Sequence, residues 1–357
     1  MRITHLQLKN FRCFESLHLD FHAPVILIAG LNGAGKTSLL EAMHYVGYLR
    51  SFRTHLPQEL MMFNKESFFI KVSLQGTFDE SYELQVGFSK KKRLVKVNDK
   101  ALSSYKELLH YYRVITVTEE DLGLIKEGPD LRRLFIDQFI VLNDTDFSTL
   151  LKRNKAIVEQ RNALLRKGGS SESYHLWTHQ LWQTSAFIEE KRRAALATIS
   201  QALIILINEY FNQEFQVNFT YQHKKALLGS YEEFQNKYPH LYNDEQRFGY
   251  SLFGAHLDDF LIWFKDLKSK SFASRGQQKL ILILLKAAQI KLLKEQGRDT
   301  ILLLDDFMTD FDQIRTQILL KMLTDLKIQL IFTVPAHQGQ LEETLRLYSP
   351  SFTKLTI

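Results

Sequence analysis

Eight consecutive residues have the composition of a phosphate-binding loop. The stretch reads Gly-Leu-Asn-Gly-Ala-Gly-Lys-Thr and fits G-x-x-x-x-G-K-[S/T] at every position. Its glycines let backbone N–H groups approach phosphate oxygens, its lysine reaches the β- and γ-phosphates of ATP, and its threonine hydroxyl ligates Mg²⁺. The alternative is a Gly-rich turn that fits by chance. The predicted ATP contacts are Gly30, Leu31, Asn32, Gly33, Ala34, Gly35, Lys36 and Thr37.

Two adjacent carboxylates near the C-terminus complement this loop. Four apolar residues, Ile301 to Leu304, precede Asp305 and Asp306. They predict a strand buried beside the phosphate-loop strand, with Asp305 meeting Mg²⁺ together with Thr37. Asp306 is the candidate for orienting or deprotonating the attacking water, and it joins Lys36 as a predicted catalytic residue. Because Asp reaches less far than Glu, we expect slow hydrolysis. The alternative is an ordinary strand–loop junction with a solvated Asp.

A second phosphate-binding device is predicted at Ser274-Arg-Gly-Gln-Gln278. A Ser hydroxyl, a Gly backbone and the N-terminus of a helix that starts near residue 277 can together hold a phosphate. One nucleotide does not need two such devices from one chain. The second phosphate-binding site is explained if Ser274, Gly276 and Gln277 bind the γ-phosphate of a nucleotide that a partner subunit holds. The alternative is an ordinary N-capped helix.

An α/β sheet has to position these motifs. The apolar, β-prone residues 25–29 predict a buried parallel strand before the loop, and residues 38–49 predict a helix after it. Further buried strands are expected at 300–304 and 328–334, with helices at 277–295 and 313–326. Shorter runs predict strands at 3–8, 17–21, 68–75, 82–88, 94–97 and 114–117. Those from 68 to 97 are expected to form an antiparallel meander.

The middle of the chain has a different character. Residues 130–143, with Asp130 as cap, 147–166 and 173–211 predict helices, and 216–221 predict a strand. Residues 168–172 are expected to be the loosest segment, and 227–246 to be irregular. The predicted domains are an ATPase lobe at 1–115 and 249–357, interrupted by a mainly helical lobe at 116–248. No long coiled coil is expected, because clean heptads are missing.

Composition excludes several classes of protein. The 357 residues contain one cysteine, Cys13, which excludes an intrachain disulfide and a Cys-based metal site. No apolar stretch reaches the ~18 residues of a membrane span, and the first residues are unlike a signal peptide, so a cytoplasmic protein without membrane contact is expected. The net charge of +6 is compatible with a polyanionic partner, although it is a weak signal alone.

The motifs together resemble the RecF family, in the SMC-like branch of ATP-binding-cassette ATPases. The resemblance rests on their order and spacing over most of the chain. The matching segments are Leu6–Phe14, Gly30–Thr37, Arg50–Thr54, Glu119–Leu122, Gly128-Pro129, Arg132–Asp137, Gln160–Asn162, Gly254–Asp259, Phe272–Gln278 and Leu303–Asp306. The implied fold is an α/β P-loop ATPase head, lobe I, with an antiparallel β subdomain and a mainly helical lobe II.

Two segments depart from the family pattern. RecF proteins usually have Gly-Pro-His-Arg-Asp-Asp where this chain has Gly254-Ala-His-Leu-Asp-Asp259, and Ser-Glu-Leu-Asp where it has Thr309-Asp-Phe-Asp312. Because the family places both segments near the dimer-dependent ATP site, the departures bear on hydrolysis and dimer coupling more than on ATP binding. His256, Asp258 and Asp259 also resemble a metal cluster, although a structural or ATP-linked role is preferred.

The resemblance implies an ATP-switched DNA clamp. Two chains would sandwich two ATP molecules, close on DNA at gaps or junctions, and help to load the recombinase with RecR and RecO; hydrolysis would reopen the dimer. Contacts to the DNA backbone are expected to dominate. The DNA-binding candidates are Arg50, Arg53, Lys90, Lys91, Lys92, Arg93, Arg132, Arg133, Lys152, Arg153 and Arg161. The alternative for Lys90–Arg93 is a hairpin tip that only increases solubility. The alternative for Arg132 and Arg133 is an ion pair with Asp130 or Asp137.

Two other functions remain as alternatives. A DNA-binding scaffold with a degenerate ATP site would explain the altered residues 309–312. A transporter ATPase subunit of the same superfamily would need a Leu-Ser-Gly-Gly-Gln signature, where this chain has Ala273-Ser-Arg-Gly-Gln277. ATP turnover measured beside ATP-dependent dimerisation separates the clamp from the scaffold. Salt-sensitive binding to duplex DNA separates both from the transporter subunit.

Overall fold

A computed structural model describes residues 1–76, 80–168, 170–211, 215–227, 229–306, 308–336 and 339–357, apart from the side chains of 171, 309 and 340. The chain divides into two compact units. The sheet unit comprises Met1–Leu122, Leu206–Asn212 and Ser274–Ile357, and the helical unit comprises Gly123–Ile205 and Gln213–Ala273. The two units are described separately.

A five-stranded parallel sheet forms the centre of the sheet unit. Its order is β14 (Thr353–Thr356), β3 (Val25–Gly30), β13 (Gln329–Pro335), β12 (Ile301–Asp305) and β8 (Val114–Val117). Every neighbouring pair is parallel, and β3 is buried throughout, as its apolar sequence predicts. The expectation that β12 lies beside β3 is wrong, because β13 lies between them. Asp305 is therefore paired in register with Thr333 of β13.

A second sheet in this unit is antiparallel. Its order is β2 (Phe14–Asp20), β1 (Arg2–Phe11), β4 (Ser67–Gln75), β5 (Ser81–Ser89), β6 (Lys92–Val97) and β7 (Lys100–Ala101). The predicted meander is confirmed by the antiparallel pairing of β4 with β5 and of β5 with β6. Helix α1 (Lys36–Tyr48) packs on strands of both sheets, and one hydrophobic core joins Leu39 and Met43 of α1 with Ile70 and Leu303. This core anchors the helix that follows the phosphate loop.

The remaining helices of the sheet unit were predicted in part. The helix expected at 277–295 is α10 (Arg275–Glu295), and that expected at 313–326 is α11 (Gln313–Asp325). Two further helices were missed, α2 (Tyr105–Tyr111) and α12 (Gly339–Tyr348). Short 3₁₀ turns lie at Pro57–Leu60 (η1), Glu120–Leu122 (η2) and Met308–Asp310 (η3). In the described part of the chain, no helix combines the length and the apolar character that crossing a bilayer requires.

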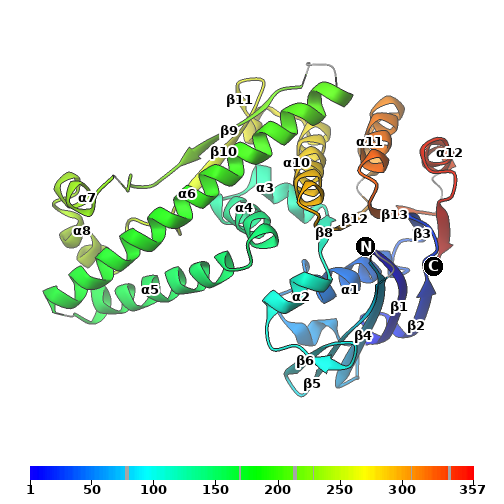
Figure 1. Cartoon of the computed structure of the whole chain (residues 1–357), viewed down its shortest axis with the longest axis horizontal. Coiled ribbons are helices and arrows are strands. Elements are labelled where there is room, and N and C mark those ends of the chain that lie inside the picture. The colour runs from blue at the N-terminus through cyan, green and yellow to red at the C-terminus, as the bar shows by residue number, and fades with distance from the viewer. Residues whose placement is uncertain (77–79, 169, 212–214, 228, 307, 337–338) are drawn as a thin grey trace. The chain divides into compact units, whose positions relative to one another are not determined.

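The helical unit consists of helices and one small sheet (Figure 1). Its helices are α3 (Gly123–Lys126), α4 (Pro129–Asn143), α5 (Phe147–Lys167), α6 (Ser171–Tyr210, whose end lies in the sheet unit), α7 (Tyr231–Lys237), α8 (Leu241–Phe248) and α9 (Ser269–Phe272). Its sheet has the order β11 (Leu267–Lys268), β10 (Asp259–Phe264) and β9 (Val217–Gln222).

Three expectations for this unit differ from the structure. Gly128 rather than Asp130 occupies the N-cap of α4, because Pro129 takes the first helical position. Residues 227–246, of which residue 228 lies outside the described residues, contain α7 and most of α8. Helix α6 begins within 168–172, of which residue 169 lies outside the described residues.

The observed division of the chain also differs from the predicted domain boundaries. Residues 249–273 belong to the helical unit and not to the C-terminal ATPase part, because β10 pairs antiparallel with β9 along six residue pairs. At the other boundary, β8 is a strand of the parallel sheet, so the sheet unit extends to Leu122. Both differences come from strand pairing between segments far apart in the sequence.

Candidate nucleotide site

The phosphate loop connects β3 to α1 with two glycines in left-handed conformations. Gly33 has φ +84° and Gly35, the N-cap of α1, has φ +100°. A Cβ on Gly35 would lie 2.5 Å from the Phe14 ring, so a larger residue would force that ring to move and would also strain the backbone. Among the described residues, no side chain caps the N-terminus of α1. Its first N–H groups and the positive end of its dipole are therefore available to an anion.

Lys36 places a cation directly over this loop. Its side chain is nearly buried, and its ammonium donates hydrogen bonds to the carbonyl oxygens of Gly30 at 2.9 Å and Leu31 at 3.0 Å. These bonds hold Nζ at the loop, where its charge also interacts with the Asp306 carboxyl. The charge is thus positioned for phosphate oxygens.

Thr37 and Asp305 meet at the carboxyl edge of the parallel sheet. The Thr37 hydroxyl donates to Asp305 Oδ1 at 3.1 Å, although the two residues are 268 positions apart in the sequence. Thr333 of the intervening strand donates to the same oxygen at 2.6 Å and accepts from the Asp306 backbone N–H at 2.9 Å. Sequence reasoning missed Thr333, whose signal is a hydroxyl in the otherwise apolar run Leu330–Val334. One buried hydroxyl therefore fixes both residues of the acidic pair.

Asp306 has a different environment from Asp305. Its backbone has φ +46°, which Asp tolerates better than most residues, and its side chain is exposed. Partial desolvation, followed by the negative charge of Asp305, raises the pKa of the Asp306 carboxyl; Lys36 and Lys279 oppose this shift. A carboxyl with a raised pKa accepts a proton more readily than an ordinary Asp, which suits a residue that orients or deprotonates water.

The N-terminus of α10 contains the second predicted phosphate device. Ser274 is the N-cap and accepts a hydrogen bond from the Gln277 N–H at 3.3 Å, while Gln277 Oε1 accepts from the Ser274 N–H at 2.8 Å. The capping role that the sequence left open is thus present. Ser274 is exposed, and a Cβ on Gly276 would meet no atom within 4 Å. The helix end consequently leaves space for a ligand or a second chain.

A charge cluster behind this helix end was not foreseen from the sequence. Lys279, which is almost fully buried, lies 2.6 Å from an Asp310 carboxylate oxygen and 3.0 Å from one of Glu119. Arg275 also pairs with Glu119 and lies 3.5 Å from Asp310. The cluster therefore connects the start of α10 to the segment that follows Asp305 and Asp306. Of the departing residues 309–312, the Thr309 side chain lies outside the described residues.

Two other motifs from the sequence meet at a buried carboxylate on α1. Glu41 is fully buried and accepts from both Nε and a terminal nitrogen of Arg12, at 2.7 and 2.6 Å. Ser51 also donates to Glu41, and Arg53 lies 4.0 Å from it. Ser51 Oγ in turn accepts the N–H groups of Arg53 and Thr54. The segment that carries the DNA candidates Arg50 and Arg53 is thereby fixed to the helix after the phosphate loop.

The basic hairpin between β5 and β6 is exposed. Lys90 and Lys91 have φ of +48° and +62° and form its turn, and Lys92 is exposed beside them. Arg93 donates to the carbonyl of Leu49, the C-cap residue of α1, so it has a structural contact of its own. Arg50 is exposed, with its guanidinium 5.6 Å from the centre of the Tyr48 ring. In the helical unit, Lys152 and Arg153 are exposed on α5.

Three arginines predicted to contact DNA are instead engaged inside the helical unit. Arg132 is 7% exposed and binds both oxygens of Asp259, at 2.6 and 2.9 Å. Arg133 donates to the Asp258 carbonyl and pairs with Asp130, as the alternative allowed. Arg161 is fully buried against Glu245. Intramolecular carboxylates therefore occupy the guanidinium groups of Arg132 and Arg161, which favours structural roles for both over the predicted DNA contacts.

The segment 254–259 is held by ion pairs and hydrogen bonds within the helical unit. Besides the Asp259–Arg132 pair, Asp258 accepts from the Tyr221 hydroxyl at 2.8 Å. Arg192 donates to the Ala255 carbonyl at 2.6 Å and binds Asp137. Burial, and then the charge of Arg133, lowers the pKa of His256 to about 4. Described residues contain no group of three side chains placed to bind a metal ion, and these contacts favour the structural role.

Replacing Thr333 with Val should separate positioning from binding. The change keeps the shape but removes the hydroxyl, which leaves the Asp306 N–H unsatisfied and Asp305 less constrained. We expect ATP hydrolysis to fall roughly tenfold or more and the free energy of unfolding to fall by about 1–3 kcal/mol. Thr116→Val is the matched control, because Thr116 is a buried threonine of β8 that bonds to His44. Equal turnover in the two variants would contradict the positioning role.

The fold and this edge of the sheet define an α/β P-loop nucleotide-binding protein of the ATP-binding-cassette type. Residues 2–354 match the RecF/RecN/SMC N terminal domain. The chain is 30% identical to the DNA replication and repair protein RecF of Clostridium acetobutylicum over 332 residues, which are 92% of this chain and 91% of that protein. The chain belongs to the RecF/RecN/SMC N-terminal-domain family and, within it, to the RecF proteins as a divergent member.

Two solved structures extend the comparison. The recombination mediator protein RecF with ATPrS, of the RecFOR pathway, has a TM-score of 0.85 and 24% identity, covering 99% of this chain and 96% of that one. The corresponding structure of RecF with ATP has a TM-score of 0.83 and 25% identity, covering 93% of this chain and 91% of that one. The fold is therefore that of these two RecF structures over nearly the whole chain.

Proposed function

We propose that this chain is an ATP-dependent DNA-binding protein of recombinational DNA repair and replication maintenance. The observation that carries the proposal is the convergence of Lys36, Thr37 and Asp305 at one edge of the sheet, from segments 268 residues apart. The relative at 30% identity is named a DNA replication and repair protein, and a RecF structure at 25% identity contains ATP. Both support ATP and DNA as the ligands.

The residues at the site fit ATP with Mg²⁺. Uncapped N–H groups of α1 and the Lys36 ammonium would bind the β- and γ-phosphates. The Thr37 hydroxyl and an Asp305 carboxylate oxygen, 3.1 Å apart, are hard oxygen ligands of the kind that Mg²⁺ prefers. When bound, the ion neutralises charge that develops on the phosphates. Asp306 would orient or deprotonate the attacking water, with Lys36 stabilising the transferred phosphoryl group.

ATP would act as a dimerisation ligand. The exposed N-terminus of α10 would bring Ser274, Gly276 and Gln277 to the γ-phosphate of an ATP held by a second copy. A ligand that contacts both chains binds the closed dimer better than the separate monomers, and so shifts that equilibrium. The cluster of Lys279, Asp310 and Glu119 would keep the helix end aligned with the residues after Asp306. Slow hydrolysis would reopen the dimer.

The closed dimer would bind DNA at gaps or junctions through the phosphate backbone. Its exposed cations include the hairpin tip formed by Lys90, Lys91 and Lys92, together with Arg50 and Arg53. Such contacts are tolerant of sequence and sensitive to salt. By its family, the protein would act with RecR and RecO to promote loading of the recombinase.

Replacing Lys90, Lys91 and Lys92 together with Ser tests the DNA-binding part of the proposal. We expect weaker binding to gapped duplex DNA with Mg-ATP, and a smaller slope of log affinity against log salt, by up to about 2.7 for three phosphate contacts. Fluorescence anisotropy over a salt series measures both. The matched control replaces Lys265, Lys268 and Lys270, three exposed lysines around another hairpin turn, at β10–β11. Equal losses in both triple variants would contradict a specific role for the β5–β6 tip.

A scaffold without turnover is the second candidate function. The observation that favours it is the short side chain of Asp306, an exposed carboxylate whose backbone is held by Thr333. Such a protein would bind ATP and DNA normally while releasing almost no phosphate. Phosphate release measured in the presence of gapped DNA separates the two functions, because the clamp requires turnover to reset.

A further inference from the structure

A pocket of about 600 Å³ lies in the sheet unit at the amino ends of the parallel strands. Val25 begins β3, Gln329 begins β13, and Thr300 precedes β12; all three line the pocket. The phosphate loop leaves the opposite, carboxyl end of β3. A strand of this length spans roughly 17 Å, so the pocket is separate from the nucleotide site. Its volume is within the range of sites for small molecules.

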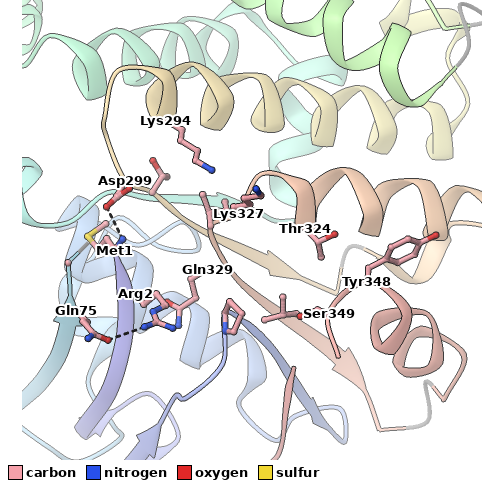
Figure 2. Close-up of a pocket in the computed structure, with 15 residues that line it drawn as sticks. Met1, Arg2, Gln75, Lys294, Asp299, Thr324, Lys327, Gln329, Tyr348 and Ser349 are labelled. Carbon is pink, nitrogen blue, oxygen red and sulfur yellow. Dashed lines mark hydrogen bonds and ion pairs between the residues drawn. The ribbon is translucent and has the colours of Figure 1, made fainter. Parts of the chain in front are cut away.

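The pocket is lined by more positive than negative side chains. Figure 2 shows Lys294 and Lys327 on one side and Arg2 on the other. Among the described lining residues, Asp299 is the one carboxylate, and it accepts a hydrogen bond from the Met1 ammonium at 2.8 Å. The pocket lining therefore has three cationic side chains, and its one described carboxylate is already paired with the Met1 ammonium. A ligand with two or three negative charges would balance them.

In the described part of the chain, two of the three cations, Arg2 and Lys327, form no ion pair within the protein. Lys294 donates to the carbonyl of Leu326 at 2.6 Å and so caps the C-terminus of α11. Arg2 donates to the side-chain amide oxygen of Gln75 at 3.1 Å, which orients its guanidinium but does not neutralise it. Lys327 is exposed at the rim. Arg2 and Lys327 are consequently the residues available to an anion.

The rest of the lining suits a molecule with more than an anionic group. The hydroxyl-bearing side chains of Thr324, Tyr348 and Ser349 line the side opposite Asp299 (Figure 2). Pro24 and Ile328 add apolar surface. The floor is rigid, because the buried Gln329 side chain accepts from the Ile3 N–H at 2.7 Å and donates to the Ile3 carbonyl at 2.9 Å. A preformed floor and mixed walls are typical of small-molecule sites.

We propose that this pocket, here called the basal pocket, binds a phosphorylated small molecule of nucleotide size. Its phosphate contacts Arg2 and Lys327, and its organic part lies against Tyr348 and Pro24. The site is independent of the phosphate loop and of ATP binding there. Phosphate is preferred over a single carboxylate because a phosphate monoester carries about two charges and offers three acceptor oxygens to cations on two sides.

The test uses the full chain with Lys36→Met, so that the phosphate loop contributes little. Isothermal titration in the absence of Mg²⁺ measures AMP, GMP, ribose 5-phosphate and inorganic pyrophosphate as probes. We expect saturable binding of at least one nucleotide or sugar phosphate with one site per chain. Adding Arg2→Ala and Lys327→Ala should raise the Kd about tenfold or more. Lys321→Ala, an exposed lysine of α11 that does not line the pocket, should leave it unchanged.

The outcomes separate the basal pocket from the alternatives. Absence of saturable binding for all four probes would overturn the proposal, as would a Kd unaffected by Arg2→Ala and Lys327→Ala. Equal binding of pyrophosphate and the nucleotides would overturn the role of Tyr348 and Pro24. ATP affinity of the Arg2→Ala, Lys327→Ala variant with an intact Lys36 should equal that of the wild type, so failure here leaves the proposed ATP site untouched.

Discussion

Lys36→Met should lower the affinity for ATP roughly 100- to 1,000-fold while leaving the fold intact. Met keeps the length of the nearly buried side chain but removes the ammonium that donates to the carbonyls of Gly30 and Leu31. Charge-assisted hydrogen bonds to phosphate contribute about 1.5–3 kcal/mol each, and two of them at about 1.5–2 kcal/mol each correspond to this loss. Titration of a fluorescent ATP analogue with Mg²⁺ measures the change.

The control for this variant is Lys71→Met. Lys71 is a half-buried lysine of β4 that pairs with Glu83, and it lies on the antiparallel sheet. Its replacement removes one positive charge without touching the phosphate loop, so the affinity for ATP should change less than about twofold. An affinity of Lys36→Met within threefold of the wild type would show that ATP does not bind at the loop.

Arg161→Met should be among the most destabilising substitutions in the chain. Arg161 is fully buried, donates to Ser251 at 2.8 Å and to the Tyr174 hydroxyl at 2.7 Å, and pairs with the equally buried Glu245. Removing the cation leaves the Glu245 carboxylate in the interior without its charge partner. We expect the free energy of unfolding to fall by about 3–5 kcal/mol, measured by urea denaturation.

An exposed pair in the same unit supplies the comparison for Arg161. Arg193 pairs with Glu189 one turn away on α6 and is half exposed. Arg193→Ala should therefore cost less than about 1 kcal/mol. If Arg161→Met instead left stability unchanged and weakened DNA binding, the buried position of Arg161 would be contradicted and its predicted DNA contact would be restored.

The sequence predicted most strands and helices but not how the strands are ordered. The runs at 25–29, 300–304 and 328–334 have clear apolar signals, and all three are strands of the parallel sheet. Their lateral order depends on contacts between segments about 300 residues apart, which local patterns do not contain. For this reason the sequence predicts β12 beside β3, and the role of Thr333 on the intervening strand is not predicted.

Local sequence patterns also fail to predict the ion-pair partners of buried charged residues. Local sequence shows that Arg132 and Arg161 are basic, but their partners Asp259 and Glu245 lie 127 and 84 positions away. Burial of an arginine with a distant carboxylate leaves no local pattern. The phosphate loop differs, because its function depends on eight consecutive residues and a preceding strand, all visible in one stretch.

One helix start is indicated by the local sequence but is not among the predicted elements. Ser230 and Glu233 form a capping box at the start of α7, in a segment expected to be irregular. The spacing Ser-x-x-Glu predicts such a helix start. Its polar surroundings, with few apolar residues at helical spacing, concealed the short helix that follows. The Ser274–Gln277 capping box of α10 has the same form, whereas the alternative predicted from the sequence was only an ordinary N-capped helix.

The most direct test of the central proposal is the mass of the protein in solution, measured by light scattering with and without Mg-ATP. The proposal predicts that the wild type doubles its mass only with Mg-ATP, and that Lys36→Met stays a monomer. Ser274→Arg, at the exposed cap of α10, should bind ATP only with the affinity of the wild-type monomer and should remain a monomer with Mg-ATP. A wild-type protein that binds ATP but stays a monomer would contradict the ATP-dependent clamp.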